Sequence, residues 1–182
     1  VGAWLAWRRG SIAEAIGIPL VLTLRAAPEF WLGMVLLAIF AFGLGWLPSG
    51  GANSAGMQFP STLARLTSPD FLRHLVLPAA TLALYLQGLP LLLMRSNMLD
   101  VLQEDYVMMA RMKGLPEWRI LLLHAARNAL LPVVTAFALG LGASVGGNVV
   151  VETVFSWPGL GRVLVDAVAS SDLSLIHISE PT

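Results

Sequence analysis

The residues able to do chemistry are concentrated in one polar stretch, Asp100–Pro132, which holds eight of the chain's 22 charged residues (11 basic plus 11 acidic). No Asp, Glu, Lys or Arg occurs from His74 to Met94 or from Asn128 to Val151, over 21 and 24 residues. Each apolar run is long enough to cross a bilayer, which takes about 20 residues. A charged segment between two spans lies at a membrane surface, where its charges can set the register of a bound partner.

This polar stretch reads as helix, turn, helix, and its four basic residues favour the cytoplasmic side. Val101–Lys113 has good helix formers, with acidic residues early and basic residues late, which complements the helix dipole. Gly114 is placed for a left-handed cap, and Pro116 suits the first turn of a second helix that runs toward Asn128. A charged hairpin with no docking role has the same pattern, so the charges alone leave both interpretations open.

Catalytic patterns are missing from the sequence. The chain has no cysteine, no H-E-x-x-H and no G-x-x-x-x-G-K-[ST] phosphate loop. Glu152 is the only acid within or beside the last apolar run, and His74 has no metal-binding partner one turn away. We therefore expect no enzyme activity, no catalytic residue, no metal site and no cofactor, and we interpret His74 as an interfacial or hydrogen-bonded side chain.

Composition predicts the fold class. Of 182 residues 57% are hydrophobic and 12% charged, with a mean hydropathy of +0.76, whereas a soluble domain carries about 25% charged residues. The zero net charge suggests no nucleic-acid partner. We predict an all-α, polytopic transmembrane bundle truncated at both ends, because Arg8 and Arg9 close a span already cut. Residues 173–182 (LSLIHISEPT) are expected to be a non-native tail.

The apolar runs predict the spans in order. Ile12–Leu24 is too short to span alone, and Pro28 should kink or end its helix. Phe30–Leu47 is predicted as the second span, Phe71–Met94 as the third and Leu130–Val151 as the fourth.

Local signals predict the connections. Ser11 and Glu14 have capping-box spacing. Pro48–Pro69 is rich in turn residues and should form an outer loop. Glu152–Arg162 should leave the membrane on the outer side, and Val163–Ala169 should begin another helix.

A few small or polar residues lie at span depth. Gly142 and Gly146 form a G-x-x-x-G pair that lets helices approach closely. Gln87, Ser144 and Asn148 are polar. These five residues are expected either to pack helices together or to line a solute pathway, and the sequence does not choose between the two.

Several segments carry a resemblance to a known family. YVMMARMKGLPEWRILLLHAARNALLPVVT resembles the cytoplasmic loop of permease subunits of bacterial binding-protein-dependent ABC importers. That loop has Glu-Ala-Ala, three residues, then Gly. Ala110 and Gly114 match it, whereas Met108 and Met109 replace the Glu and the first Ala. With VVVETVFSWPGLGR, LRHLVLPAATLAL and PEFWLGMVLLAIFAFGLGWLPSGG, the chain resembles the dipeptide/oligopeptide/nickel branch over residues 1–172.

The resemblance implies a function and partners. Residues 1–172 would be part of a multi-pass inner-membrane permease domain that imports di- or oligopeptides, with its coupling loop at 100–128. ATP hydrolysis would occur in a separate subunit. The implied partners are a second permease subunit, identical or not, two cytoplasmic ABC ATPases, an extracytoplasmic solute-binding protein and membrane lipid. A nickel or other small-solute importer, or an unrelated channel or anchor, is the alternative.

Within that loop the resemblance points to an ATPase contact. Small residues would allow close approach, charges would set register, and Asp100–Met109 and Ile120–Pro132 should be continuous with the third and fourth spans. The expected ATPase-coupling residues are Ala110, Arg111, Lys113, Gly114, Glu117 and Arg119.

Overall fold

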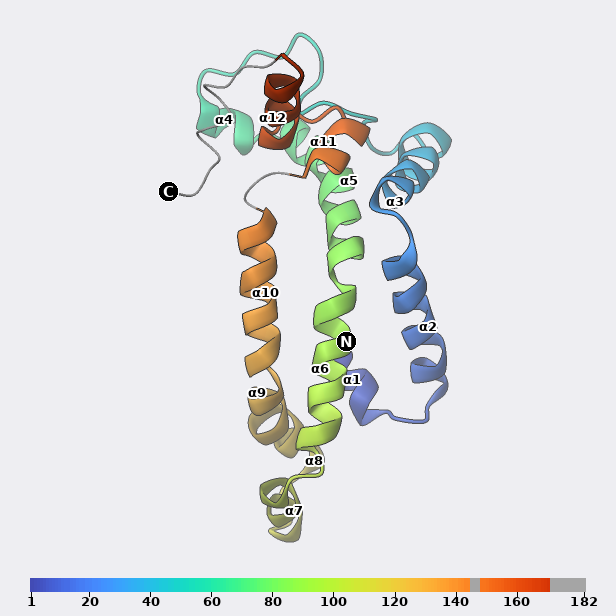
Figure 1. Ribbon diagram of the computed structural model, residues 1–182, viewed down its shortest axis with the longest axis vertical. Helices are drawn as coiled ribbons and strands as arrows, with labels where there is room; N and C mark the ends of the chain where they lie inside the picture. Colours follow the sequence, from blue (N-terminus) through green and yellow to red (C-terminus); the bar gives the residue numbers. More distant parts are fainter. Residues whose placement is uncertain (145–147, 171–182) are drawn as a thin grey trace. The chain divides into compact units, whose positions relative to one another are not determined.

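The computed structural model describes residues 1–144 and 148–170, which are helical with no strand among them (Figure 1). They form two compact units. The first comprises Val1–Ala26 and Leu86–Ala143, and the second comprises Ala27–Tyr85 and the chain from Ser144. The first unit contains α1 (Gly2–Trp7), α2 (Ile12–Ala26), α6 (Gly88–Val101), α7 (Asp105–Met112), α8 (Glu117–Arg119), the π-helical segment η2 (Ile120–Ala125), α9 (Ala126–Ala129) and α10 (Leu131–Ser144). The second contains α3 (Glu29–Leu36), the π-helical segment η1 (Leu37–Gly43), α4 (Thr62–Leu66), α5 (Pro69–Leu86), α11 (Val149–Val154) and α12 (Leu160–Ala169).

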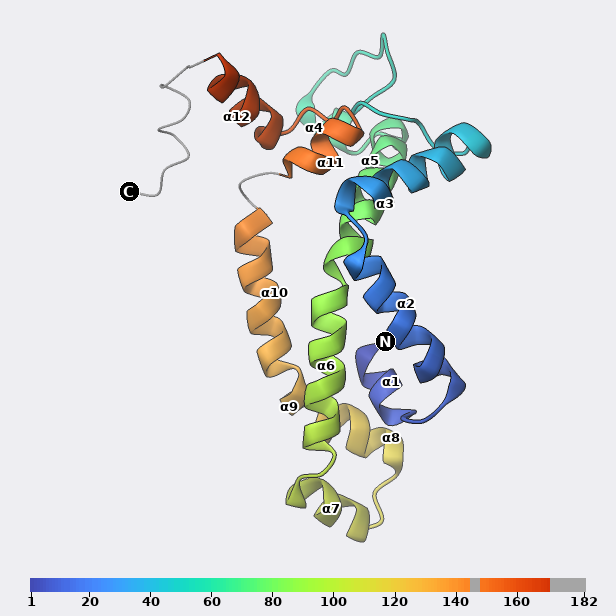
Figure 2. The same cartoon turned by 45° about the vertical axis from the view of Figure 1, so that its right-hand side comes forward.

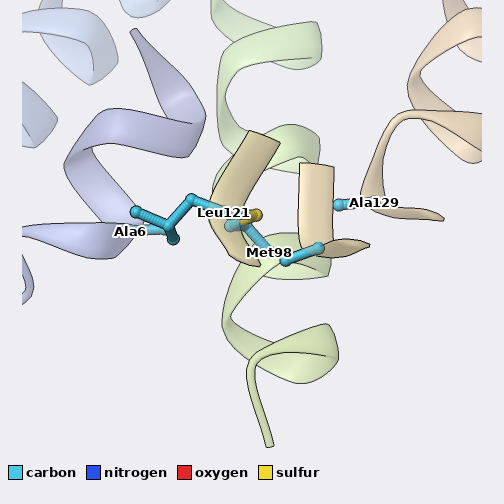
Figure 3. Close-up of a cluster of buried hydrophobic side chains, with 5 residues drawn as sticks. Ala6, Met98, Leu121 and Ala129 are labelled. Carbon is cyan, nitrogen blue, oxygen red and sulfur yellow. The ribbon is translucent and has the colours of Figure 1, made fainter. Parts of the chain in front are cut away.

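The first unit packs around small side chains. Figure 3 shows Ala6 of α1, Met98 of α6, Leu121 of η2 and Ala129 of α9 gathered in one buried cluster. Ala125 completes it and, like Ala129, has no exposed surface. Alanines allow two helix backbones to approach closely, and Met98 fills the space that remains. This cluster joins α1 and α6 to the helical run that leads into α10.

Helix α2 begins as predicted. The Ser11 hydroxyl accepts the Glu14 N–H at 3.3 Å, and the Glu14 carboxylate accepts the N–H of Gly10 at 2.6 Å, one residue before the cap. The same carboxylate also accepts the Nε–H of Arg95 at 2.9 Å, which links α2 to α6. Sequence reasoning did not find this ion pair, because its partners are 81 residues apart.

The second unit is built around Phe155, which is 1% exposed and packs with Leu37, Leu77 and Val151. The predicted outer loop is largely irregular as expected, although it contains α4. The Gly51 N–H donates to the Phe155 carbonyl at 2.8 Å, so this loop is bound to the core of its unit.

One helical stretch, Pro69–Val101, is long and apolar enough to cross a membrane, among the residues that the structure describes. It contains the predicted third span and confirms it. Two further spans are possible if each of two bent helix pairs crosses the membrane as a single span. The pairs are Ile12–Ala26 with Glu29–Gly43, and Glu117–Ala129 with Leu131–Gly140.

Two predicted spans need correction. The helix predicted over Phe30–Leu47 ends at Gly43, and it begins where Pro28 provides the extended cap of α3. The single helix predicted over Leu130–Val151 is wrong, because Asn148 has a non-helical backbone (φ −115°, ψ 86°) and α11 after it is a separate helix. Asn148 starts α11, since its side-chain oxygen accepts the Val151 N–H at 3.1 Å, a strong N-cap signal.

The chain's end follows the prediction as far as the structure reaches. Helix α12 begins at Leu160, slightly before the predicted start at Val163. The expected non-native tail, residues 173–182, lies outside the described residues, so the predicted end of the domain at 172 stays a prediction.

Candidate functional site

The elbow, residues 100–128, does not continue the helix that precedes it. Helix α6 ends at Val101, and Glu104 has the extended backbone angles of an N-cap (φ −69°, ψ 146°) before α7 begins. Tight turn bonds join Gln103 N–H to the Asp100 carbonyl at 3.0 Å and Glu104 N–H to the Val101 carbonyl at 3.1 Å. The predicted continuity through Asp100–Met109 is therefore wrong, because three residues turn the chain between the helices.

The turn after α7 is the predicted one. Figure 2 shows the turn that joins α7 to α8. Gly114 has φ +72°, and its N–H donates to the Arg111 carbonyl at 2.9 Å. A side chain there would meet nothing within 4 Å, so glycine is required by the left-handed backbone and not by crowding. Pro116 is the N-cap of α8 and not part of its predicted first turn, because the helix begins at Glu117.

The elbow has a small core of its own. Val107 and Ile120 are fully buried, and Ala110 between them is 6% exposed. The structure therefore explains the small side chain of Ala110 by packing inside the elbow. A direct contact between Ala110 and another protein stays a prediction.

Large apolar side chains cover the outward surface of the same elbow. Met108, Met109 and Met112 are 58%, 51% and 74% exposed, and Trp118 is 58% exposed. Exposed apolar clusters beside charged residues mark sites of protein contact. Methionine is also adaptable enough to fit an irregular partner surface. Sequence reasoning noted Met108 and Met109 only as departures from a family pattern, and the helical spacing from Met108 to Met112 was the available signal.

Charges flank these apolar side chains. The Arg111 Nε–H donates to Glu117 Oε1 at 3.1 Å, with both side chains nearly half exposed. The Arg119 guanidinium lies 5.9 Å from the Trp118 ring centre, within cation–π range. Lys113 is also exposed. Exposed pairs contribute at most about 1 kcal/mol to stability, so these charges add little to the fold, and their predicted role in orienting a partner stays a prediction.

Side chains fasten α7 to the helical run from Glu117 to Ala129. The Asn128 side-chain amide donates to the Tyr106 hydroxyl at 2.8 Å. That hydroxyl donates in turn to the His124 carbonyl at 3.4 Å. The run is helical from Glu117 to Ala129, but the predicted continuity of Ile120–Pro132 with the fourth span is wrong, because Leu130 is a turn residue and the helix axis bends by 48° before α10.

The other predicted residues are not part of the elbow sequence. Gln87 precedes α6, and its carbonyl accepts the Leu91 N–H at 3.1 Å. Gly142 is exposed, with open space where a side chain would start. Gly146 and the Ser144 side chain fall outside the described residues.

Asn148 makes a bond that fits helix packing. Its side-chain amide donates to Glu29 Oε1 at 2.5 Å within the second unit. His74, as expected, is hydrogen-bonded, with Nδ1 2.8 Å from the Asp70 carbonyl oxygen. Residues 1–144 and 148–170 contain no group of three or more His, Cys, Asp or Glu side chains that could hold a metal ion.

The chain resembles known proteins over most of its length. Residues 1–179 match the family described as binding-protein-dependent transport system inner membrane component. The chain is 43% identical to the oligopeptide transport system permease protein AppB of Bacillus subtilis, over 83% of this chain and 46% of that protein. It is 38% identical to the di/tripeptide transport system permease protein DppB of Pseudomonas aeruginosa, over 97% and 56%. It is 42% identical to the glutathione transport system permease protein GsiC of Pectobacterium atrosepticum, over 94% and 50%. The chain thus spans about half the length of the curated relatives it matches.

Proposed function

Because this chain belongs to the family of binding-protein-dependent transport system inner membrane components, we propose that it is part of the permease subunit of an ATP-driven importer. The names of two relatives support di- or oligopeptides as the cargo. The complete permease would cross the bacterial inner membrane several times and form part of the solute pathway. Nickel or another small solute is the alternative cargo, and the relatives' names do not favour it.

The exposed apolar side chains of the elbow carry this proposal. An elbow that only connected two spans would gain nothing from presenting Met108, Met112 and Trp118 to water. Burying one methionine side chain against a partner is worth about 1.5–3 kcal/mol. We assign this surface to a cytoplasmic ATPase subunit, which would hydrolyse ATP and move the elbow.

The charged residues of the elbow would determine the orientation of the ATPase on the elbow surface. Lys113 and Arg119 are exposed beside the apolar side chains, and the pair of Arg111 with Glu117 holds a fixed arrangement of opposite charges. A second permease subunit and an extracytoplasmic solute-binding protein complete the proposed assembly, in keeping with the family's description.

Gly114 offers a sharp test in the complete permease, assembled with its ATPase and binding protein. Gly114→Arg places a long cation on the exposed turn, where nothing within 4 Å blocks it. We expect ATPase association and peptide uptake to fall at least about tenfold, as loss of roughly 1.4 kcal/mol of contact energy would produce, while membrane insertion stays normal. Copurification and uptake in vesicles measure the two effects.

A matched control separates docking from backbone strain. Gly56 also has a left-handed backbone, φ +84°, and a Cβ added there would meet nothing within 4 Å, but it lies in the outer loop. Gly56→Arg should leave ATPase association unchanged, and Gly114→Ala should lose far less than Gly114→Arg. Normal uptake in the Gly114→Arg permease would refute the docking role.

A further inference from the structure

The backbone between α6 and α7 is not helical, so it transmits motion from one helix to the other poorly. Helix α6 ends at Val101, and Gln103 and Glu104 are exposed residues of a turn. Glu104 does not cap α7 with its side chain. A force on α7 therefore reaches α6 through this turn and through Val101 and Leu102, which pack against the elbow core, and not through a continuous helix.

The contacts from α7 to the helical run before α10 are much firmer. Val107 of α7 and Ile120 of η2 share the fully buried core of the elbow. Tyr106 lies beside them and is half-buried, and its hydroxyl is the point where α7 is bonded to the run. The bonded groups, the His124 carbonyl and the Asn128 amide, are one helical turn apart. Tyr106 thus forms hydrogen bonds with two successive turns of the run, directly before the bend into α10.

The run is held on its other side by a second amide. Asn97 of α6 donates to the Ala129 carbonyl at 3.4 Å, beside the buried contact of Met98 with Ala129. Through these contacts with Ala129, a displacement of the run would also displace α6. Displacement of α7 would therefore reach the run through Tyr106 and the elbow core, and α6 both through the run and through the packing of Val101 and Leu102 on that core.

We propose that Tyr106, through its bond to Asn128, is the positioning residue that transmits motion of the elbow to α10. This inference rests on the proposed function, since it says how an ATPase's motion enters the permease. Tyr106→Phe removes both hydroxyl bonds and keeps the ring in the elbow core. Asn128→Ala removes the stronger bond from the exposed side of α9, where truncation leaves packing intact.

The first experiment measures the attachment itself and needs no transport. The 182 residues contain no cysteine, so Met112→Cys and Leu139→Cys can carry a pair of spin labels in the complete permease once any cysteine outside these residues is replaced by serine. Both positions are exposed, at 74% and 73%. We expect a single narrow distance between α7 and α10, which broadens in Tyr106→Phe and in Asn128→Ala. Tyr85→Phe, which removes a hydroxyl on α5, should leave it narrow.

The second experiment measures peptide transported per ATP hydrolysed in the reconstituted importer. We expect the ratio to fall about fivefold in Tyr106→Phe and in Asn128→Ala, as loss of one hydrogen bond of roughly 1 kcal/mol implies. The double variant should fall no further than either single one, because both remove the same bond. ATPase binding should stay normal in all of them.

The outcomes separate this inference from the proposed function. A narrow distance in both variants, or an unchanged transport ratio, overturns the role of Tyr106 even when the importer works. An unmodified importer without ATP-driven uptake overturns the proposed function instead, and the label distances then still decide whether Tyr106 holds α7 to α10. Loss of ATPase binding in Tyr106→Phe would also overturn the inference, because it places the residue in docking and not in transmission.

Discussion

The elbow and the predicted outer loop of the second unit are both polar connections between apolar runs, yet their exposed apolar side chains are arranged differently. In the outer loop the Ser54 hydroxyl and N–H both donate to Asp70, at 2.6 and 2.8 Å, and Arg65 donates to Asn53 at 2.6 Å. In the elbow, Met112 and Trp118 point away from the chain. Both connections bond to themselves and both expose apolar side chains, Met57 and Leu63 in the loop among them, but the elbow places three exposed methionines on one short helix, α7, beside exposed charges.

Glycine shows the same contrast. Gly159 beside α12 is required by crowding, since a Cβ would lie 2.2 Å from the Glu152 carboxyl carbon. Glu152 is 8% exposed, and its carboxylate accepts the Arg162 N–H at 2.7 Å. This bond holds the start of α12 to α11. Gly114 of the elbow has open space around it. One glycine is required by packing inside the chain, and the other by its left-handed backbone.

The largest expected effect would come from exchanging the two large aromatic residues of these regions for alanine. Phe155→Ala opens a cavity in the core of the second unit and should lower the free energy of unfolding by about 3–5 kcal/mol. Trp118→Ala should change it by less than about 0.5 kcal/mol, because Trp118 lies on the surface, and should instead weaken ATPase binding. Thermal unfolding in detergent measures the first effect, and copurification measures the second. Equal stability losses would abolish the contrast.

Methionine allows the next comparison, between Met112 of the elbow and Met57 of the outer loop. They are 74% and 53% exposed, so an aspartate is tolerated structurally at both. Met112→Asp should cut uptake about tenfold or more, because a buried contact worth roughly 1.5–3 kcal/mol is lost and a charge is desolvated. Met57→Asp should leave uptake unchanged. A similar loss in both variants would assign no special role to the elbow.

The smallest effect is expected at the elbow's ion pair. Glu117→Gln should change stability by less than about 1 kcal/mol, because both members of the pair with Arg111 are nearly half exposed. The rate of ATPase association should become less sensitive to salt, since one charge that orients the partner is gone. Stopped-flow association at low and high salt measures this change. A loss of uptake as large as that in Met112→Asp would show that charge, and not apolar contact, dominates docking.

The sequence by itself determined the local features. The uncharged runs predicted a span over Phe71–Met94, which lies within the long helical stretch Pro69–Val101, and the order of charges predicted helix, turn and helix in the elbow. Gly114 predicted its own left-handed turn, and Ser11 predicted the start of α2. These signals are read correctly because hydropathy, capping and backbone conformation act within one or two turns of a helix.

Only the tertiary structure decided which side of each helix meets the rest of the chain. It turned Ala110 inward and Met112 outward, interrupted the helix before Asp105, and began the separate helix α11 after Asn148. It also joined Glu14 to Arg95, and Glu29 to Asn148 across 119 residues. Such contacts depend on how helices distant in sequence pack together, and spacing along one helix carries no record of the partner it will meet.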